Sequence, residues 1–220
     1  MEQTLKLIEY PTEAQWLEAK KTKIGGTDAS AILGENKFKT NIQAYRQFKG
    51  IETAEDISGK KCVADGKALE SIIAMAWNID NSEKYSLQQM DNTLALHDDI
   101  DYVAGSFDGI ITAIETGKKL IWECKTTTFH SFAMTKAWKD CIPQMYYIQV
   151  LFYLWISGYT EAILTARAYH KYAQKPFYTT TDYRIERNEN DIEILESEIT
   201  KYWEENIQKN IEPSGLMPSL

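Results

Sequence analysis

The spacing of hydrophobic residues changes near residue 84 and divides the chain into two parts. Before this point apolar residues recur at helical intervals, and a helix is expected over residues 63–77. After it, short runs of strand type predict β-strands at 85–90, 93–99, 101–114 and 118–126. The order of elements is therefore several helices followed by a sheet.

Capping residues mark the ends of the N-terminal helices. Thr12 with Gln15, and Thr40 with Gln43, each form a capping box that begins a short helix. Between them lies the stretch IGGTDASAILG at 24–34, with a Gly-Gly turn, a Thr/Asp cap, a short apolar helix and a terminating glycine. These signals predict three short helices before residue 51.

The second half combines a long apolar helix with further strands. Pro143 fits the first turn of a helix that Gly158 closes, strands are expected at 161–170 and 177–187, and an amphipathic helix over 190–209. We therefore predict an α/β (α+β) fold in one domain spanning 1–220. Its parts are a helical N-terminal region (1–80), a sheet with its helix (84–186) and a C-terminal helix (188–210).

Composition narrows the class of protein. The 220 residues are 44% hydrophobic and 25% charged, as in soluble globular domains. No apolar run approaches the roughly 18 residues that span a bilayer, and no export signal is evident, so no membrane association is expected. Three cysteines without CxxC spacing indicate a reducing, cytoplasmic location and argue against zinc or iron–sulfur sites.

The net charge of −8 does not exclude nucleic acid as a partner, because the charge is unevenly distributed. Residues 182–220 carry 4 Lys or Arg against 10 Asp or Glu, whereas residues 1–67 carry 11 against 10. Local positive patches govern contact with phosphates even in an acidic protein.

The segment LIWECKT at 120–126 places an acid and a base in an otherwise apolar strand. Glu123 and Lys125 project from the same face. If Thr116 and Gly117 form a two-residue hairpin loop, Asp108 lies opposite Lys125 and the three side chains cluster. Paired carboxylates repel unless a cation intervenes, and oxygen ligands suit Mg²⁺ or Mn²⁺. Taken alone, the Glu–Lys pair also fits an ordinary solvated strand face.

Five stretches together resemble one family. They are IGGTDASAILG (24–34), GKALE (66–70), AGSFDGII (104–111), IWECKT (121–126) and YYIQVLFYLWISG (146–158). In this order they resemble the YqaJ-type viral recombinase exonucleases, the phage lambda exonuclease family within the PD-(D/E)XK nuclease superfamily. The resemblance implies a restriction-endonuclease-like core with a central mixed sheet flanked by helices.

The resemblance also implies roles for individual residues. The metal ligands would be Glu70, Asp108, Glu123 and the backbone carbonyl of Cys124, around two Mg²⁺ ions for which Mn²⁺ can substitute. The catalytic residues would be Lys125, Glu123, Asp108 and Gln149. The DNA or its 5′-phosphate would contact Lys20, Thr27, Ser106 and Tyr153. Lys20 stands where relatives often carry Arg, and Lys21 and Lys23 are alternatives for this anchor.

The function implied by the resemblance is 5′-to-3′ degradation of one strand of linear double-stranded DNA. It would release 5′-mononucleotides and leave 3′ overhangs for a single-strand annealing protein, and the enzyme would be a homotrimer encoded by a phage or prophage. The alternatives are another PD-(D/E)XK nuclease, either an endonuclease or a RecB-type repair nuclease, and a catalytically silent DNA-end-binding module.

Overall fold

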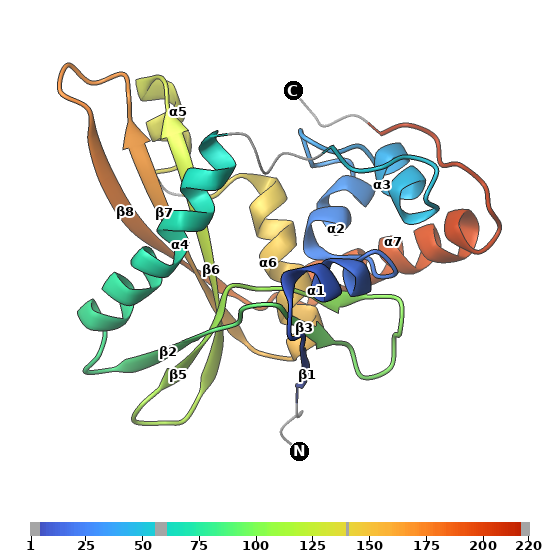
Figure 1. The fold of residues 1–220 in the computed structure, drawn as a ribbon, viewed down its shortest axis with the longest axis horizontal. Helices are drawn as coiled ribbons and strands as arrows, with labels where there is room; N and C mark the ends of the chain where they lie inside the picture. The colour runs from blue at the N-terminus through green and yellow to red at the C-terminus, as the bar shows by residue number, and fades with distance from the viewer. Residues whose placement is uncertain (1–4, 56–60, 140, 217–220) are drawn as a thin grey trace.

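Two β-sheets and the helices around them make up the computed structural model of the chain, which describes residues 5–55, 61–139 and 141–216 (Figure 1). The side chains of residues 61–64, including Cys62, lie outside the described part. Among the described helices, none has both the length and the apolar character needed to cross a membrane.

The larger sheet has five strands in the order β2-β5-β6-β7-β8. Only β6 and β7 run parallel, and the other neighbours are antiparallel, so the sheet is mixed as predicted. Its strands are β2 (Tyr85–Gln89), β5 (Gly109–Ala113), β6 (Lys119–Phe129), β7 (Glu161–His170) and β8 (Phe177–Glu186). A three-stranded sheet contains β1 (Lys6–Glu9), β3 (Thr93–Leu96) and β4 (Ala104–Gly105).

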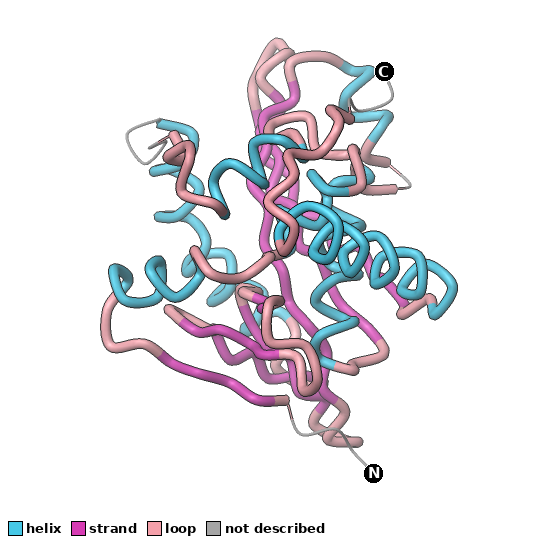
Figure 2. The backbone as a smooth tube through the Cα atoms, turned by 90° about the vertical axis from the view of Figure 1, so that its right-hand side faces the viewer, coloured by secondary structure: helices cyan, strands magenta, loops and turns pink. Residues whose placement is uncertain are grey.

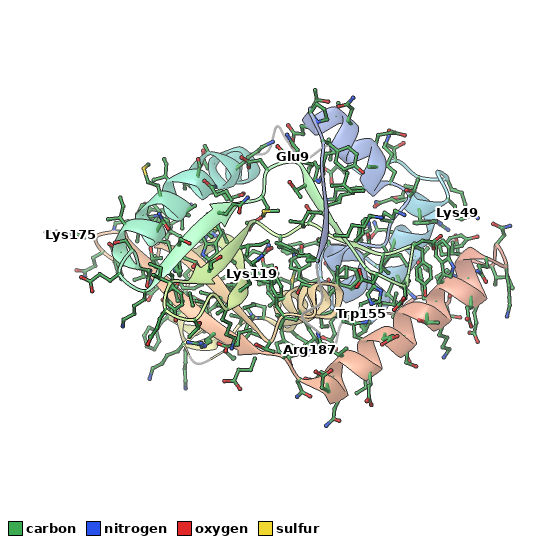
Figure 3. The ribbon with its side chains drawn as sticks, turned by 90° about the horizontal axis from the view of Figure 1, so that it is seen from below. Glu9, Lys49, Lys119, Trp155, Lys175 and Arg187 are labelled. Carbon is green, nitrogen blue, oxygen red and sulfur yellow. The ribbon has the colours of Figure 1, made fainter. Side chains whose placement is uncertain are left out.

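Seven α-helices accompany these strands in the described ranges. They are α1 (Glu13–Lys20), α2 (Gly26–Ile32), α3 (Asn41–Phe48), α4 (Lys61–Asp80), α5 (Phe132–Ala137), α6 (Gln144–Ser157) and α7 (Glu189–Tyr202). A π-helical turn, η1 (Trp203–Ile207), continues α7. Figure 3 shows α7 along the side of the molecule away from α4.

Alternation along β6 assigns each helix layer to one face of the larger sheet. Trp122 and Cys124 pack with Trp77 of α4 in one apolar cluster, whereas Ile121 belongs to the core that contains α6. Successive side chains of a strand point to opposite faces, so α4 and α6 cover opposite sides of the sheet. Figure 2 shows helices on both sides of the strands.

Capping follows the sequence at two of the three N-terminal helices. Thr12 and Thr40 accept the backbone N–H groups of Gln15 and Gln43, as predicted. The third helix, α2, begins differently, because its N-cap is Gly25 rather than a Thr or Asp. The Asp28 carboxylate instead accepts the Gly25 N–H at 3.0 Å.

The predicted strand at 101–114 is wrong in one respect, because it is two strands in different sheets. β4 ends at Gly105 and β5 begins at Gly109, which leaves Ser106, Phe107 and Asp108 as a bridge between the sheets. Gly109 permits the close approach of β2, since a Cβ there would lie 2.9 Å from the Gln88 carbonyl oxygen. Strand β1 and helix α5 were not predicted.

Candidate active site

The register of β5 with β6 differs from the predicted hairpin by two residues. Ile110 pairs with Ile121 rather than with Glu123, because the loop between the strands spans four residues, 114–117, and not two. Gly117 has a φ of +69°, the left-handed conformation that closes such loops. Since side chains repeat every two residues, this shift leaves every side chain on its predicted face.

Asp108 directly precedes β5 and lies beside the middle of β6. Its Oδ2 accepts the backbone N–H of Cys124 at 2.7 Å. The N–H and C=O groups of one strand residue point to the same side, so the Cys124 carbonyl also faces the edge of β6 where Asp108 lies. The structure thus brings Asp108, Glu123 and Lys125 together, as the sequence predicts.

Glu123 is only 1% exposed, and its two carboxylate oxygens have different surroundings. Oε1 accepts hydrogen bonds from Lys125 Nζ at 2.6 Å and from Gln149 Nε2 at 3.0 Å. Oε2 is buried and has no hydrogen-bond partner among the described residues. A buried oxygen without a partner is costly, and a bound cation would satisfy it.

The electrostatics of the site follow from burial and from the crowding of acids. Burial raises the pKa of Glu123 to about 8, and the Asp108 charge adds to the shift while Lys125 opposes it. Burial and then Asp108 raise the pKa of Glu70 to about 7. Burial also raises the pKa of Asp108, against the effect of Lys125. Burial lowers the pKa of Lys125, but the charges of Glu123 and Asp108 outweigh it and hold this pKa above its ordinary value.

The donor set fits a hard cation, although the side chains do not form a closed cluster. Within the described ranges no three His, Cys, Asp or Glu residues converge as a ready-made metal site. Glu70, on α4, is close enough for the Asp108 charge to raise its pKa, but it does not complete such a cluster. The residues that fit a divalent ion best are Asp108, Glu123 and the Cys124 carbonyl, all oxygen donors.

Gln149 belongs to a hydrogen-bonded chain that begins at Glu123 and ends in the β4–β5 bridge. Its Nε2 also donates to Tyr153 Oη at 2.8 Å, and that hydroxyl donates to the Ser106 carbonyl at 2.9 Å. Tyr153 is 3% exposed and its hydroxyl is used internally, so its burial argues against the predicted DNA contact. Ser106 joins the chain through its backbone, which leaves its hydroxyl for the predicted phosphate contact.

Gly26 allows helix α2 to lie directly against this hydrogen-bonded chain, a role that no sequence pattern predicts. A Cβ on Gly26 would lie 2.9 Å from Gln149 Cγ and from Tyr153 Cε1. Helix α2 therefore packs directly against the residues that position Glu123. Thr27, the next residue, is exposed at the first turn of α2, where a phosphate contact is predicted.

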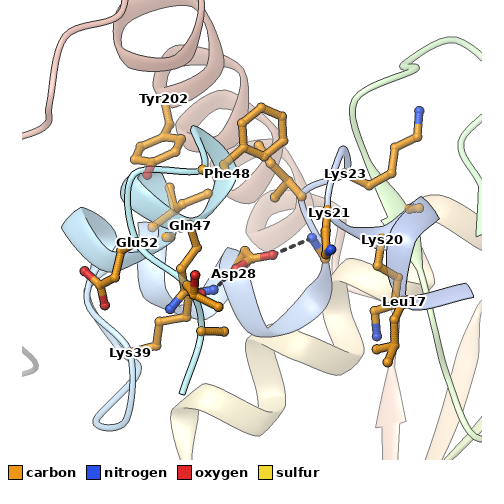
Figure 4. A pocket seen from close by; sticks show the side chains of 18 residues that line it. Leu17, Lys20, Lys21, Lys23, Asp28, Lys39, Gln47, Phe48, Glu52 and Tyr202 are labelled. Atoms are coloured by element: carbon orange, nitrogen blue, oxygen red, sulfur yellow. Dashed lines mark hydrogen bonds and ion pairs between the residues drawn. The ribbon is translucent and has the colours of Figure 1, made fainter. Parts of the chain in front are cut away.

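The three candidate lysines for the phosphate anchor lie differently (Figure 4). Lys21 pairs with Glu18 at 2.6 Å, and Lys23 donates to the Asp101 carbonyl. The Lys20 ammonium lies 4.1 Å from the Trp16 ring centroid. Burial lowers its pKa, and Asp28, Glu123 and Asp108 oppose that shift.

A cavity of about 580 Å³ adjoins these lysines. Lys20, Lys21, Lys23 and Lys39 line it together with Asp28 and apolar side chains from α2 and α3. Lys39 is neutralised by Asp28 at 2.6 Å. Since Asp28 also accepts the Gly25 N–H, that amide is not free for an anion.

The chain thus combines a mixed sheet with acids beside the β5–β6 strand pair and a glutamate on α4, the helix that covers one face. The model of the YqaJ-like viral recombinase domain matches residues 15–160, and the chain belongs to this family. It is 32% identical over 145 residues to the uncharacterized protein YqaJ of Bacillus subtilis (strain 168). That alignment covers 66% of this chain and 42% of the relative's length.

Solved structures confirm the predicted fold. An alkaline exonuclease (LHK-Exo) from Laribacter hongkongensis matches with a TM-score of 0.66 and 16% identity, over 90% of this chain and 94% of that one. LHK-Exo in complex with dAMP gives a TM-score of 0.64 with the same identity and coverage. A phage-related exonuclease from Haemophilus somnus 129PT gives 0.50 with 17% identity, over 85% and 96% of the two chains.

Proposed function

We propose that the chain is a metal-dependent exonuclease that degrades one strand of linear double-stranded DNA from its 5′ end. It would release 5′-mononucleotides and leave 3′ single-stranded overhangs. The observation that carries this proposal is the buried Glu123 carboxylate, with one oxygen bonded to Lys125 and Gln149 and the other without a partner. Membership of a viral recombinase family and the fold of alkaline exonucleases support it.

The metal would be held by Asp108, Glu123 and the Cys124 carbonyl, with Glu70 at the second of two positions. Bound Mg²⁺, or Mn²⁺ in its place, would polarise the scissile phosphate and make water a better nucleophile. Asp108 is already oriented by the Cys124 N–H, and Glu123 by Gln149. These hydrogen bonds hold one oxygen of each carboxylate in place before a cation binds.

Lys125 would donate hydrogen bonds to the attacking water and to the phosphate oxygens. Its ammonium is directed by Glu123 and lies 5.4 Å from the Tyr146 ring centroid, which restricts it to the site. Gln149 would act as a positioning residue, because it joins Glu123 to Tyr153. Lys20 would receive the 5′-phosphate, assisted by Thr27 and the Ser106 hydroxyl.

The proposed partners are double-stranded DNA ends, a single-strand annealing protein and two further copies of this chain in a homotrimer. A phage- or prophage-encoded protein acting in the bacterial cytoplasm fits the viral recombinase family. Pairing of the overhang by an annealing protein would complete recombination.

The test uses blunt linear duplex labelled at one 5′ or one 3′ end, with and without Mg²⁺. The proposal predicts early, Mg²⁺-dependent release of label as mononucleotide from the 5′-labelled end alone. Cleavage of closed circular duplex would identify an endonuclease instead. Binding to DNA ends without any release of nucleotides would identify a catalytically silent module.

A further inference from the structure

One end of the larger sheet is basic and aromatic in an otherwise acidic chain. We define this basic aromatic end as residues 126–139 and 166–181, which comprise the end of β6, helix α5 and the β7–β8 hairpin (Figure 1). It contains Lys136, Lys139, Arg167, Lys171 and Lys175 and no Asp or Glu, whereas the whole chain has a net charge of −8. Figure 3 shows Lys175 at the opposite extremity of the molecule from Lys49.

Two cross-strand rows on the face toward α4 bring rings and a guanidinium together. One row is Thr128, Tyr169 and Tyr178, and the next is Thr126, Arg167 and Thr180. The rings of Tyr169 and Tyr178 lie 4.8 Å apart and are tilted by 32°. Arg167 Cζ lies 4.8 Å from the Tyr178 ring centroid, and Arg167 Nη1 donates to Thr180 Oγ1 at 3.2 Å.

Helix α4 covers this face only as far as the second row. Trp77 donates to Asp182 at 2.8 Å, and a Cβ on Gly66 would lie 2.9 Å from Thr126 Oγ1. Beyond that contact Tyr178 is 54% exposed. On the other face Phe177 is 47% exposed and stacks on His170 at 4.3 Å. Exposed rings therefore occupy both sides of the hairpin.

We propose that the basic aromatic end binds single-stranded DNA. Bases would stack on Tyr178 and Tyr169, and Arg167, Lys171 and Lys175 would contact phosphates. Every base offers a π-face when unpaired, whereas duplex bases are already stacked, so rings beside cations favour single strands. The two ranges carry five Lys or Arg residues and no acid, and such a concentration of positive charge suits a polyanion such as DNA.

The position of this surface relates it to the candidate active site. Thr128 lies three residues beyond Lys125 on β6, roughly 10 Å along the strand. The single strand bound here would be the 3′ overhang that cleavage leaves, and this identification rests on the proposed function. The binding of single strands itself does not depend on catalysis.

The test measures fluorescence anisotropy of labelled oligo-dT of about 20 nucleotides in EDTA, where no cleavage occurs, against blunt duplex of the same length. Tyr178→Ala should weaken oligo-dT binding about 10-fold, whereas Tyr178→Phe keeps the ring and should bind as the wild type does. The double variant Lys171→Ala/Lys175→Ala should also bind oligo-dT more weakly. The slope of its log binding constant against log salt concentration should be smaller in magnitude by about 1 to 2. Arg184→Ala is the matched control, an exposed arginine on the same face of β8 at its other end.

Unchanged oligo-dT affinity in Tyr178→Ala and in the lysine double variant would overturn the proposal. Equal losses on duplex and single strand would also overturn it, because they would indicate only a basic patch. Nucleotide release from duplex is measured separately for the same variants. A variant that loses oligo-dT binding but still releases nucleotides supports the proposal. If the wild type releases no nucleotides yet binds oligo-dT through Tyr178, the single-strand site stands and the proposed enzymatic function fails.

Discussion

The ammonium of Lys125 lies 2.6 Å from Glu123 Oε1, while Oε2 of the same carboxylate has no hydrogen-bond partner in the described part of the chain. A buried ion pair is stable only when the remaining hydrogen-bonding positions of both groups are satisfied. The half-satisfied carboxylate beside Asp108 therefore marks a place for a cation.

Lys125→Ala should lower nucleotide release by roughly 10²- to 10³-fold or more, because it removes a preorganised donor at the reacting phosphate. Affinity for duplex ends in Ca²⁺ should change little. The matched control is Lys119→Ala, an exposed lysine at the other end of β6. Near-native release by Lys125→Ala would remove this lysine from the mechanism.

The metal-free protein should lose stability as pH rises from about 5 to about 8. Burial raises the pKa of Glu123 to about 8 and of Glu70 to about 7, so the folded state binds more protons than the unfolded state across this window. The free energy of unfolding then falls with pH. Thermal unfolding in EDTA checks this, and Glu123→Gln should flatten the profile. A free energy of unfolding that rises between pH 5 and pH 8 would contradict the raised pKa values of Glu123 and Glu70.

Gly26→Ala should impair both stability and activity, because its Cβ would lie 2.9 Å from Gln149 and Tyr153. We expect a destabilisation of about 1–3 kcal/mol, as for other overpacked sites. Gly25→Ala is the matched control, since its Cβ would meet nothing closer than 3.7 Å. Urea unfolding and nucleotide release measure the two effects. Equal behaviour of the two variants would refute the close packing of α2 on α6.

Lys20→Ala should slow degradation of 5′-phosphorylated ends more than of 5′-hydroxyl ends. The charge of Lys20 is coupled to the site, whereas Lys21 is paired with Glu18 on the surface. Lys21→Ala should therefore discriminate less between the two ends. Rates on matched duplexes that differ only in the 5′ group provide the measurement, and equal slowing on both would reject Lys20 as the anchor.

Much of the fold was predictable because local signals agreed with it. The bounds of β7 match the sequence prediction, and the capping box at Thr40 is confirmed. At Thr12 only one of the two bonds of the predicted capping box forms, from the Gln15 backbone N–H to the Thr12 hydroxyl. The β1 strand was missed because its short KLIE segment is largely exposed and shows no apolar alternation. The bridge at residues 106–108 was missed because tertiary structure, which places β4 and β5 in different sheets, sets the break between them.

The candidate site was predictable because side chains alternate between the two faces of a strand. The expected register was wrong by two residues, yet Asp108 still meets β6 beside Glu123, since a shift of two preserves the face. The burial of Tyr153 and the close approach at Gly26 were not predictable. Both depend on how α2 packs against α6, segments more than 100 residues apart, for which no local pattern exists.

The most direct test of the account is binding of Mn²⁺ to the purified protein, followed by the electron paramagnetic resonance signal of the free ion. The wild type and the control Asp80→Asn, an exposed acid at the end of α4, should bind Mn²⁺ alike. Asp108→Asn and Glu123→Gln should each weaken binding by at least about 10-fold. Undiminished Mn²⁺ binding in both variants would contradict the assignment of this carboxylate pair as the metal site.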